Sequence, residues 1–373
     1  MQSFHPPNRV LMGPGPSDVP SRVLKAMAQP TIGHLDPAFV GMMDEIKTML
    51  RQAFCTDNAM TFAVSAPGSA GMECCFANLV EPGDEVIVCI NGVFGGRMKE
   101  NVERMGGTAI VVEDNWGEPV SLDKVEAAFA ANANAKLLAF VHAETSTGVR
   151  SDAKALCQLA RKNGALSLVD AVTSLGGIEL LVDEWGIDAI YSGTQKCLSC
   201  PPGLSPVSFS PAAADKILSR KSKVRSWFFD LSLVMAYWQG DGARTYHHTA
   251  PVNAMYGLHE SLVMLHEEGL QNAWGRHADM HQKLKIGLEN LGLEFVVEEQ
   301  YRLPQLNAVK FPDTVTDEAA IRKDLLQQHN LEIGAGLGAL AGKVWRIGLM
   351  GASASDANID KCLSALSQVL AKQ

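Results

Sequence analysis

The segment Tyr191-Ser-Gly-Thr-Gln-Lys196 carries a single lysine just past the short apolar run Ile187–Tyr191. An earlier apolar run, Ala165–Val169, ends directly at Asp170. Short apolar runs bounded by turn residues are typical of strands in a covered sheet. Open sheets of parallel strands bind their ligands beyond the carboxyl ends of the strands. Asp170 and Lys196 therefore mark the candidate site of this chain.

A carboxylate at one strand end and a lysine after the next strand are what pyridoxal phosphate (PLP) chemistry requires. The lysine amine forms a Schiff base with the cofactor aldehyde. The aspartate keeps the pyridine nitrogen protonated, so that the ring withdraws electrons from the bound substrate. The pair Asp170 and Lys196 indicates an enzyme.

Strand-like runs alternate with helical patterns over the first two thirds of the chain. The expected strands are Met60–Val64, Glu85–Ile90, Thr108–Val112, Leu137–Val141, Leu166–Val169 and Ile187–Tyr191. The helical patterns include Pro37–Phe54, Met72–Leu79 and Asp152–Lys162. This alternation predicts an α/β fold with a mostly parallel sheet that is covered on both faces.

The last third has a different pattern. A long helical stretch, Met255–Leu288, is interpreted as a connecting helix into a second domain. Strands are expected near Glu294–Val297, Gln305–Lys310 and Val344–Leu349, with a closing helix over Ser355–Leu370. We therefore expect an N-terminal arm (1–16), a large domain (17–254) and a smaller C-terminal α+β domain that includes the connecting helix (255–373).

Composition excludes several other classes. The 373 residues are 47% hydrophobic and 20% charged, which is ordinary for a globular protein. The net charge of −9 argues against nucleic acid as the main partner. No apolar stretch approaches the roughly 18 residues of a membrane span, and no secretory signal is visible. Eight cysteines in so long a chain do not form a disulfide scaffold, so a reducing cytoplasm is the expected compartment.

Three further features are open to two interpretations each. Ser65–Glu73 is rich in small residues between a strand and a helix, which is either an ordinary turn or a phosphate cradle at a helix N-terminus. Phe94 in a glycine-rich turn is either a buried anchor or a ring that stacks on a cofactor. Arg346 in an apolar strand is either half of a structural salt bridge or a fork for a substrate carboxylate.

Two histidine groups and one cysteine pair carry weaker signals. Tyr246-His-His-Thr249 and His277-x-x-x-His281 lack the partners of a zinc signature, so we expect no metal site. Cys197 and Cys200 have the spacing of a redox pair without a thioredoxin-like context, and they are interpreted as incidental thiols.

Over nearly its whole length the chain resembles the class V aminotransferases of PLP fold type I, close to the alanine–glyoxylate and serine–glyoxylate enzymes. The motifs that carry this resemblance are Leu11-Met-Gly-Pro-Gly-Pro-Ser17, Ile32-Gly-His34, Glu81-Pro-Gly-Asp84, Asn91-Gly-Val-Phe-Gly95, Glu144-Thr-Ser-Thr-Gly-Val149, Val169-Asp-Ala-Val-Thr-Ser-Leu-Gly-Gly177, Tyr191-Ser-Gly-Thr-Gln-Lys196, Pro201-Pro-Gly203, Tyr246-His-His-Thr249 and Arg346-Ile-Gly348. The resemblance implies a large domain with a mostly parallel seven-stranded sheet and a smaller C-terminal domain.

The resemblance also implies a role for each matching residue. Lys196 is the Schiff-base lysine and Asp170 the partner of the pyridine nitrogen, with Phe94 and Val172 on opposite faces of the ring. The other implied cofactor contacts are Thr145 at the ring hydroxyl, Gly68, Ser69 and Gln195 at the phosphate, and Tyr246 and Thr249 at the phosphate of the neighbouring subunit. Arg346 and the backbone at Gly15 are implied to hold the substrate carboxylate. Phe94 stands where relatives often have Trp, and Pro67 and Ser69 stand in a loop where relatives often have Ser-Gly-His.

The implied activity is PLP-dependent transfer of an amino group from alanine or serine to glyoxylate, by a homodimer. Alternatives are another donor or pyruvate as acceptor within the same family, or a cysteine desulfurase or lyase of the same fold. A PLP-binding regulator is a further alternative, but it predicts a fused DNA-binding segment that this sequence lacks.

Overall fold

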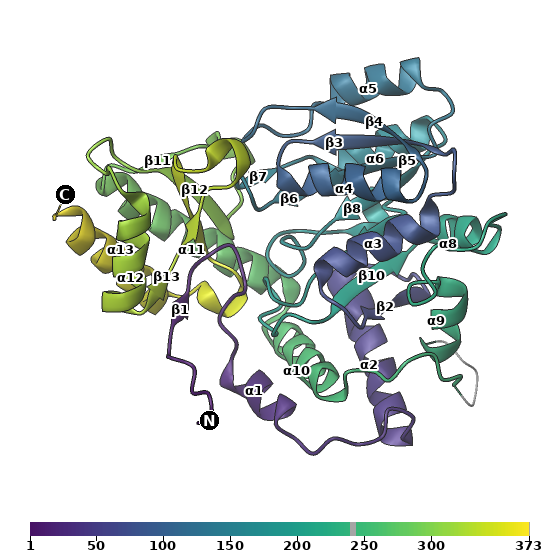
Figure 1. Ribbon diagram of the computed structural model, residues 1–373, viewed down its shortest axis with the longest axis horizontal. Coiled ribbons are helices and arrows are strands. Elements are labelled where there is room, and N and C mark those ends of the chain that lie inside the picture. The colour runs from purple at the N-terminus through teal and green to yellow at the C-terminus, as the bar shows by residue number, and fades with distance from the viewer. Residues whose placement is uncertain (239–243, 373) are drawn as a thin grey trace.

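The computed structural model describes residues 1–238 and 244–372, arranged around two sheets of unequal size (Figure 1). The strands are β1 (Val10–Leu11), β2 (Met60–Val64), β3 (Glu85–Ile90), β4 (Thr108–Glu113), β5 (Leu137–Val141), β6 (Ala143–Glu144), β7 (Val149–Arg150), β8 (Leu166–Asp170), β9 (Ala189–Tyr191), β10 (Ser205–Phe209), β11 (Glu294–Phe295), β12 (Leu306–Lys310), β13 (Leu331–Glu332), β14 (Gly334–Ala335) and β15 (Val344–Gly348). The α-helices are α1 (Ser21–Met27), α2 (Pro37–Phe54), α3 (Gly68–Leu79), α4 (Val93–Arg104), α5 (Leu122–Ala131), α6 (Ala153–Lys162), α7 (Val182–Trp185), α8 (Pro211–Leu218), α9 (Leu231–Trp238), α10 (Val252–Glu268), α11 (Leu270–Asn290), α12 (Glu318–His329) and α13 (Asp356–Leu370).

The larger sheet has seven strands in the order β2-β10-β9-β8-β5-β3-β4. Pairing is parallel except at β10, which runs antiparallel to both of its neighbours, β2 and β9. The expected α/β fold with a mostly parallel seven-stranded sheet is confirmed. The reversed strand β10 was not expected from the sequence. β10 is the strand that comes after the turn carrying Lys196, and its neighbour β2 comes much earlier in the sequence.

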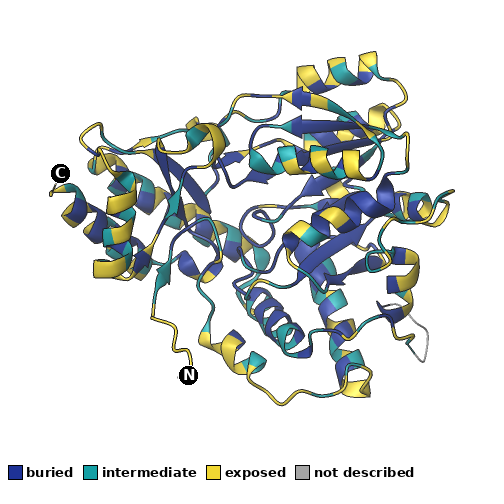
Figure 2. Cartoon of the chain, in the orientation of Figure 1, coloured by how far each residue is buried: buried dark blue, intermediate teal, exposed yellow. Residues whose placement is uncertain are grey.

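Helices cover both faces of this sheet. α3 contacts both α4 and α8, and these three helices lie over β3, β4, β5, β9 and β10, while α5, α6 and α7 form a second connected set over β3, β4, β5 and β8 (Figure 1). The strands β2, β5, β8 and β10 are therefore almost wholly buried, as Figure 2 shows for the centre of the sheet, whereas the edge strand β4 is largely exposed. This double cover explains why β2, β5 and β8 are apolar runs with no polar alternation.

The smaller sheet is antiparallel, in the order β11-β12-β15-β14, and it packs with α11, α12 and α13 on a second hydrophobic core. The N-terminal strand β1 pairs in parallel with β13, and Met12 is buried in this second core (Figure 1). The chain thus begins beside its last third. The boundaries at residues 16 and 254 stay a prediction.

The single helix expected over Met255–Leu288 is wrong. The structure has two helices, α10 and α11, that meet at Gly269, where φ is +83°. That backbone conformation favours glycine and interrupts the helical hydrogen bonds. The apolar periodicity on either side continues, which is why the sequence pattern did not reveal the break.

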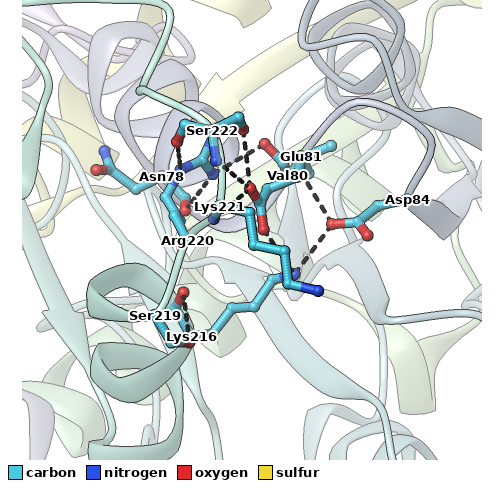
Figure 3. Close-up of polar contacts among 9 residues, drawn as sticks. All are labelled: Asn78, Val80, Glu81, Asp84, Lys216, Ser219, Arg220, Lys221 and Ser222. Carbon is cyan, nitrogen blue, oxygen red and sulfur yellow. Dashed lines mark hydrogen bonds and ion pairs between the residues drawn. The ribbon is translucent and has the colours of Figure 1, made fainter.

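A polar network joins the turn after α3 to the segment that follows α8 (Figure 3). The carboxylate of Glu81 accepts hydrogen bonds from the backbone of Lys221 and from both the backbone and the hydroxyl of Ser222, at 2.8–2.9 Å. Arg220 donates to the carbonyls of Asn78 and Val80 at 2.7 and 3.0 Å. The network fixes the segment that leads to α9 against the large sheet's helices.

Two further features are the state of the cysteines and the apolar character of the helices. The eight thiols are unpaired, and all except Cys55 are buried. Within residues 1–238 and 244–372, no helix combines the length and the apolar character that crossing a bilayer would need.

Two helical glycines give a matched test of the packing. A Cβ on Gly95 in α4 would lie 2.4 Å from the backbone oxygen of Cys89, whereas a Cβ on Gly275 in α11 would meet no atom within 4 Å. Both changes to alanine favour helix by about 0.5–1 kcal/mol. We expect Gly95→Ala to lower the free energy of unfolding by about 2 kcal/mol, because the β3 backbone cannot yield. Gly275→Ala should raise it slightly. Urea unfolding measures both, and equal midpoints would contradict the packing of α4 on β3.

Candidate active site

Asp170 is the last residue of β8, and its carboxylate is 3% exposed. Tyr191 donates its hydroxyl proton to Oδ2 at 2.7 Å, and the backbone N–H of Val172 donates to Oδ1 at 2.8 Å. Burial raises the pKa of Asp170 to about 7, and these two hydrogen bonds oppose the shift only in part. A carboxylate held in this way attracts a cationic partner, because its charge is costly to bury alone.

Tyr191 reaches Asp170 because β8 and β9 are adjacent parallel strands with those two residues in register. Burial, and then the carboxylate beside it, raises the pKa of Tyr191 well above its ordinary value, so the hydroxyl stays a donor. Tyr191 stands at the start of the lysine segment in the sequence, but its role was missed. Its place at a strand end next to Lys196 was the available signal.

Lys196 lies in the turn between β9 and β10 and is 8% exposed. Burial lowers the pKa of Lys196 to about 8, with a further contribution from the charge of Arg346, while Asp170 and Glu144 oppose the shift. An amine with a lowered pKa exists in part as the neutral base near neutral pH. This is the state that a lysine needs for nucleophilic or general-base chemistry.

The N-terminal arm closes over this lysine. Nζ of Lys196 donates to the carbonyl of Pro14, and a Cβ on Gly15 would lie 2.6 Å from Nζ. Ser17 completes the contact, with its backbone N–H on the carbonyl of Gln195 at 2.9 Å and its hydroxyl on the carbonyl of Lys196 at 2.7 Å. Gly15 thus lies beside Lys196, and only glycine fits there.

Arg346 lies in β15 of the smaller sheet and is 7% exposed. Its Nε donates to the carbonyl of Ala335 at 2.7 Å and one terminal nitrogen donates to the carbonyl of Thr145 at 3.1 Å. Burial lowers the pKa of Arg346 to about 10, and the charge of Glu144 opposes this. Among the described residues Arg346 has no ion-pair partner, so the alternative of a structural salt bridge is not supported.

The small-residue loop after β2 ends at Pro67, and α3 begins at Gly68. The backbone N–H groups of Gly68 and Ser69 precede the first N–H that bonds within the helix, that of Ala70 to Pro67. Oε1 of Gln195 is buried without a hydrogen-bond partner in the described chain, and Ser69 is exposed. The free N–H donors at this helix N-terminus are suited to an anionic group such as the phosphate expected from the sequence.

Val172, Phe94 and Thr145 lie just past the carboxyl ends of β8, β3 and β5. A Cβ on Gly68 would be 3.2 Å from Cγ2 of Val172, so Val172 borders the start of α3. Phe94 is the second residue of α4, half-buried, with the guanidinium of Arg97 4.9 Å from its ring centre. Thr145 is buried directly after β6, and its carbonyl holds Arg346. These residues come from separate elements that meet at the carboxyl edge of the large sheet.

Tyr246 and Thr249 lie apart from this group. Tyr246 is 59% exposed; its hydroxyl is 3.4 Å from Oγ1 of Thr249 and its ring is 5.2 Å from that of His34. In the described chain neither residue shares a hydrogen bond or ring contact with Lys196, Asp170 or Arg346. Their predicted contact with the phosphate of the neighbouring subunit stays a prediction.

Glu144 and Ser146 were not singled out, although both lie in the quoted motif Glu144–Val149. Glu144 is 1% exposed and bonds the backbone at the start of α4 and at Ser146. A carboxylate in a buried hairpin was the available signal, since such a charge needs partners.

Arg150, directly after the Glu144–Val149 motif, is the cation next to that motif in the sequence. It lies at the end of β7 with its side chain exposed, and it lines a cavity of about 990 Å³ together with His142, Glu179 and Glu298. That cavity is not lined by Lys196, Asp170 or Arg346. Arg150 therefore faces away from the candidate active site.

The histidine and cysteine motifs have structural partners. His277 accepts from the backbone N–H of Gly351 at 2.9 Å, and His281 bonds the amide of Asn307 at 2.8 Å. Burial raises the pKa of both Cys197 and Cys200 to about 12, so neither thiol is ionised near neutral pH.

Comparison with known proteins shows the family of the chain. Residues 9–355 match the family model Aminotransferase class-V. The chain is 41% identical to an alanine–glyoxylate aminotransferase of Oryctolagus cuniculus over 98% of this chain and 93% of that one. It is 37% identical to an (S)-ureidoglycine–glyoxylate transaminase of Bacillus subtilis, over 98% and 91%. The crystal structure of an alanine–glyoxylate aminotransferase from Nostoc sp. superposes with a TM-score of 0.97 at 45% identity, over 99% and 97%.

The family match and these relatives define an amino-group transferase. The chain belongs to the class V aminotransferases.

The raised pKa of Asp170 predicts a pH dependence of stability in the cofactor-free protein. The folded chain binds this proton more tightly than the unfolded chain, where the pKa is 3.8. The folded state is therefore favoured fully below pH 3.8, and this contribution is lost as the pH rises to about 7. Asp170→Asn should gain stability relative to wild type over this interval, by between about 1 and 4 kcal/mol.

Urea unfolding of both cofactor-free proteins between pH 4 and 8 measures this difference. Asp215→Asn, at an exposed position on α8, is the matched surface control. A difference between wild type and Asp170→Asn that stays constant across the range would contradict the buried, partly protonated carboxyl.

Proposed function

We propose that this enzyme transfers the amino group of alanine to glyoxylate, with PLP as its cofactor. The observation that carries the proposal is the buried guanidinium of Arg346. Among the described residues it donates hydrogen bonds to two backbone carbonyls and makes no direct ion pair, and its charge acts on Lys196. A desolvated guanidinium that is not engaged in a direct ion pair, beside a reactive amine, is suited to the α-carboxylate of an amino or keto acid.

The residues present fit PLP. The N–H groups at the start of α3, the hydroxyl of Ser69 and the side-chain N–H of Gln195 would donate hydrogen bonds to the phosphate. Because Oε1 of Gln195 can only accept hydrogen bonds, the side-chain amide would turn so that its N–H groups face the phosphate. Phe94 and Val172 would cover the two ring faces, Thr145 would lie at the ring hydroxyl, and Asp170 would receive the N–H of the pyridine ring.

When bound, PLP supplies an electrophilic aldehyde and a ring that takes up the electron pair left at the substrate Cα. Nζ of Lys196 would accept the Cα proton of the substrate and later return a proton, acting first as base and then as acid. The lowered pKa of Lys196 favours this exchange near pH 8. Arg346 orients the substrate carboxylate, and the charge of Asp170 is in place before the proton moves.

A small monocarboxylate acceptor is supported by two lines of reasoning. Arg346 is one cation for one carboxylate, and Arg150 opens into a different cavity, so a distal carboxylate would be left without a partner. The relatives named above differ in their donor, alanine or (S)-ureidoglycine, but both names include glyoxylate. Serine as donor and pyruvate as acceptor remain the alternatives within the family.

A donor and acceptor panel tests the proposal. With alanine as donor we expect kcat/KM for glyoxylate to exceed that for 2-oxoglutarate by about tenfold or more, which is about 1.4 kcal/mol of differential transition-state binding. Pyruvate release measures the rate. Equal turnover with 2-oxoglutarate would overturn the acceptor assignment.

Two variants control this panel. Lys196→Ala should lose both multiple turnover and the cofactor absorbance band that depends on the lysine. Arg346→Lys keeps the charge but loses the fork, so KM for alanine should rise while PLP affinity stays the same. Loss of PLP binding in Arg346→Lys would contradict its assignment to the substrate.

The desulfurase alternative is not favoured. That chemistry needs an ionised thiol at the substrate, whereas Cys197 and Cys200 are buried with raised pKa values of about 12. Sγ of Cys197 points to the carbonyl of Thr173 at 3.5 Å.

We further propose that the active unit is a homodimer in which Tyr246 and Thr249 bind the phosphate in the neighbouring subunit. The exposed positions of Tyr246 and of Trp227, 59% and 63%, support this. Trp227 stacks on His247 with ring centres 4.5 Å apart, so aromatic side chains gather on one exposed surface. Such surfaces are enriched at protein interfaces.

Subunit complementation tests the shared site. Lys196→Ala and the double variant Tyr246→Ala with Thr249→Ala should each have little activity alone at a PLP concentration that saturates only the wild type. Co-expression should restore activity, because a mixed dimer contains one site with Lys196 from one chain and Tyr246 and Thr249 from the other. No recovery in isolated mixed dimers would refute the arrangement.

A further inference from the structure

Glu144 is a buried carboxylate that the mechanism above does not use. It lies at the end of β6, and β6 pairs with β7 in a hairpin. Its environment links it to the start of α4, to Arg346 and to Lys196. We propose that Glu144 is a positioning residue for transamination: it holds Phe94 over the cofactor ring, and its charge balances Arg346 and Lys196. This inference rests on the proposed function.

The contact with α4 is made through the backbone. Oε2 of Glu144 accepts the N–H of Phe94 at 3.2 Å. Oε1 accepts the backbone N–H and the hydroxyl of Ser146 at 2.9 and 2.6 Å. Oγ of Ser146 in turn accepts the N–H of Val93 at 3.1 Å. The first two N–H groups of α4 are therefore satisfied by a hairpin some fifty residues further along the chain.

The helix has no cap of its own. The residue before α4 is Gly92, which has no side chain to accept these N–H groups. A Cβ at this position would lie 2.4 Å from Cγ and Cδ of Glu144. A serine or aspartate cap, the usual solution at a helix N-terminus, is thus replaced by the carboxylate of Glu144. Because Glu144 accepts the backbone N–H of Phe94, it fixes the backbone position from which the Phe94 ring extends.

A helix cap by itself does not require a fully buried charge. Burial raises the pKa of Glu144, and the hydrogen bonds from Ser146 and Phe94 and the charge of Arg346 oppose this. Glu144 in turn raises the pKa of Arg346, Lys196 and Asp170. Two carboxylates and two cations thus share one desolvated region. The negative charge of Glu144 helps to keep Arg346 protonated, and it opposes the lowering of the Lys196 pKa that burial causes.

A variant of the same size separates the charge and the hydrogen bonds of Glu144 from its packing. Glu144→Gln keeps the size but replaces one acceptor oxygen with a donor that faces a backbone N–H. We expect kcat to fall by about tenfold or more while KM for alanine does not rise. The pH at which the absorbance of the bound cofactor changes should shift downward, because a neighbouring negative charge that favours the protonated form is gone.

Two companion variants divide the roles. Glu144→Asp keeps the charge on a shorter side chain, so the spectroscopic pH should return toward the wild-type value while kcat stays low. Ser146→Ala keeps Glu144 charged and removes one of its donors, so it should lower kcat less than Glu144→Gln. In a Phe94→Ala background the effect of Glu144→Gln on kcat should shrink, since residues that act through one group are not additive.

The measurements are PLP titration by fluorescence, absorbance against pH, and steady-state kinetics on the purified holoenzyme. Full additivity with Phe94→Ala and an unchanged spectroscopic pH in Glu144→Gln would overturn the inference while wild-type activity leaves the proposed function standing. Wild-type protein that neither binds PLP nor releases pyruvate would instead overturn the proposed function, and this inference with it.

Discussion

Desolvation of opposite charges at one edge of the large sheet is the constraint on which the rest of the site depends. Asp170, Glu144, Lys196 and Arg346 are all buried there, and each shifts the pKa of others in the group. An isolated charge in such a place would lose its proton or gain one. The charges of these four groups are tolerated because two carboxylates and two cations share the region, with backbone groups as further partners.

This arrangement is assembled from distant segments. Asp170 and Tyr191 come from neighbouring parallel strands, whereas Arg346 comes from the smaller sheet and Glu144 from a hairpin. The contacts between these segments do not depend on a sequence motif within any one of them. They meet because β5, β8 and β9 are parallel and end at the same edge, which is where open α/β sheets bind their ligands.

The N-terminal arm joins the two cores at this point. Met12 is buried in the smaller core, and its carbonyl accepts the N–H of Gly348 at 2.8 Å. A few residues later Pro14 and Ser17 bond the lysine turn. A shift of the smaller sheet would therefore be felt both at Arg346, which it carries, and at Lys196 through the arm. This short segment therefore links the smaller sheet, which carries Arg346, to the turn that carries Lys196.

The sequence by itself determined the alternation of strands and helices and the positions of Asp170 and Lys196. Buried parallel strands must be apolar throughout, so a carboxylate and a lysine at their ends stand out, and few chemistries use that pair. Local patterns did not reveal the antiparallel β10, the break at Gly269 or the capping of α4 by Glu144. These depend on contacts between residues far apart in the chain. The direction in which Arg150 points was likewise decided only by the tertiary structure, because the pairing of the β6–β7 hairpin sets which side chains face the site.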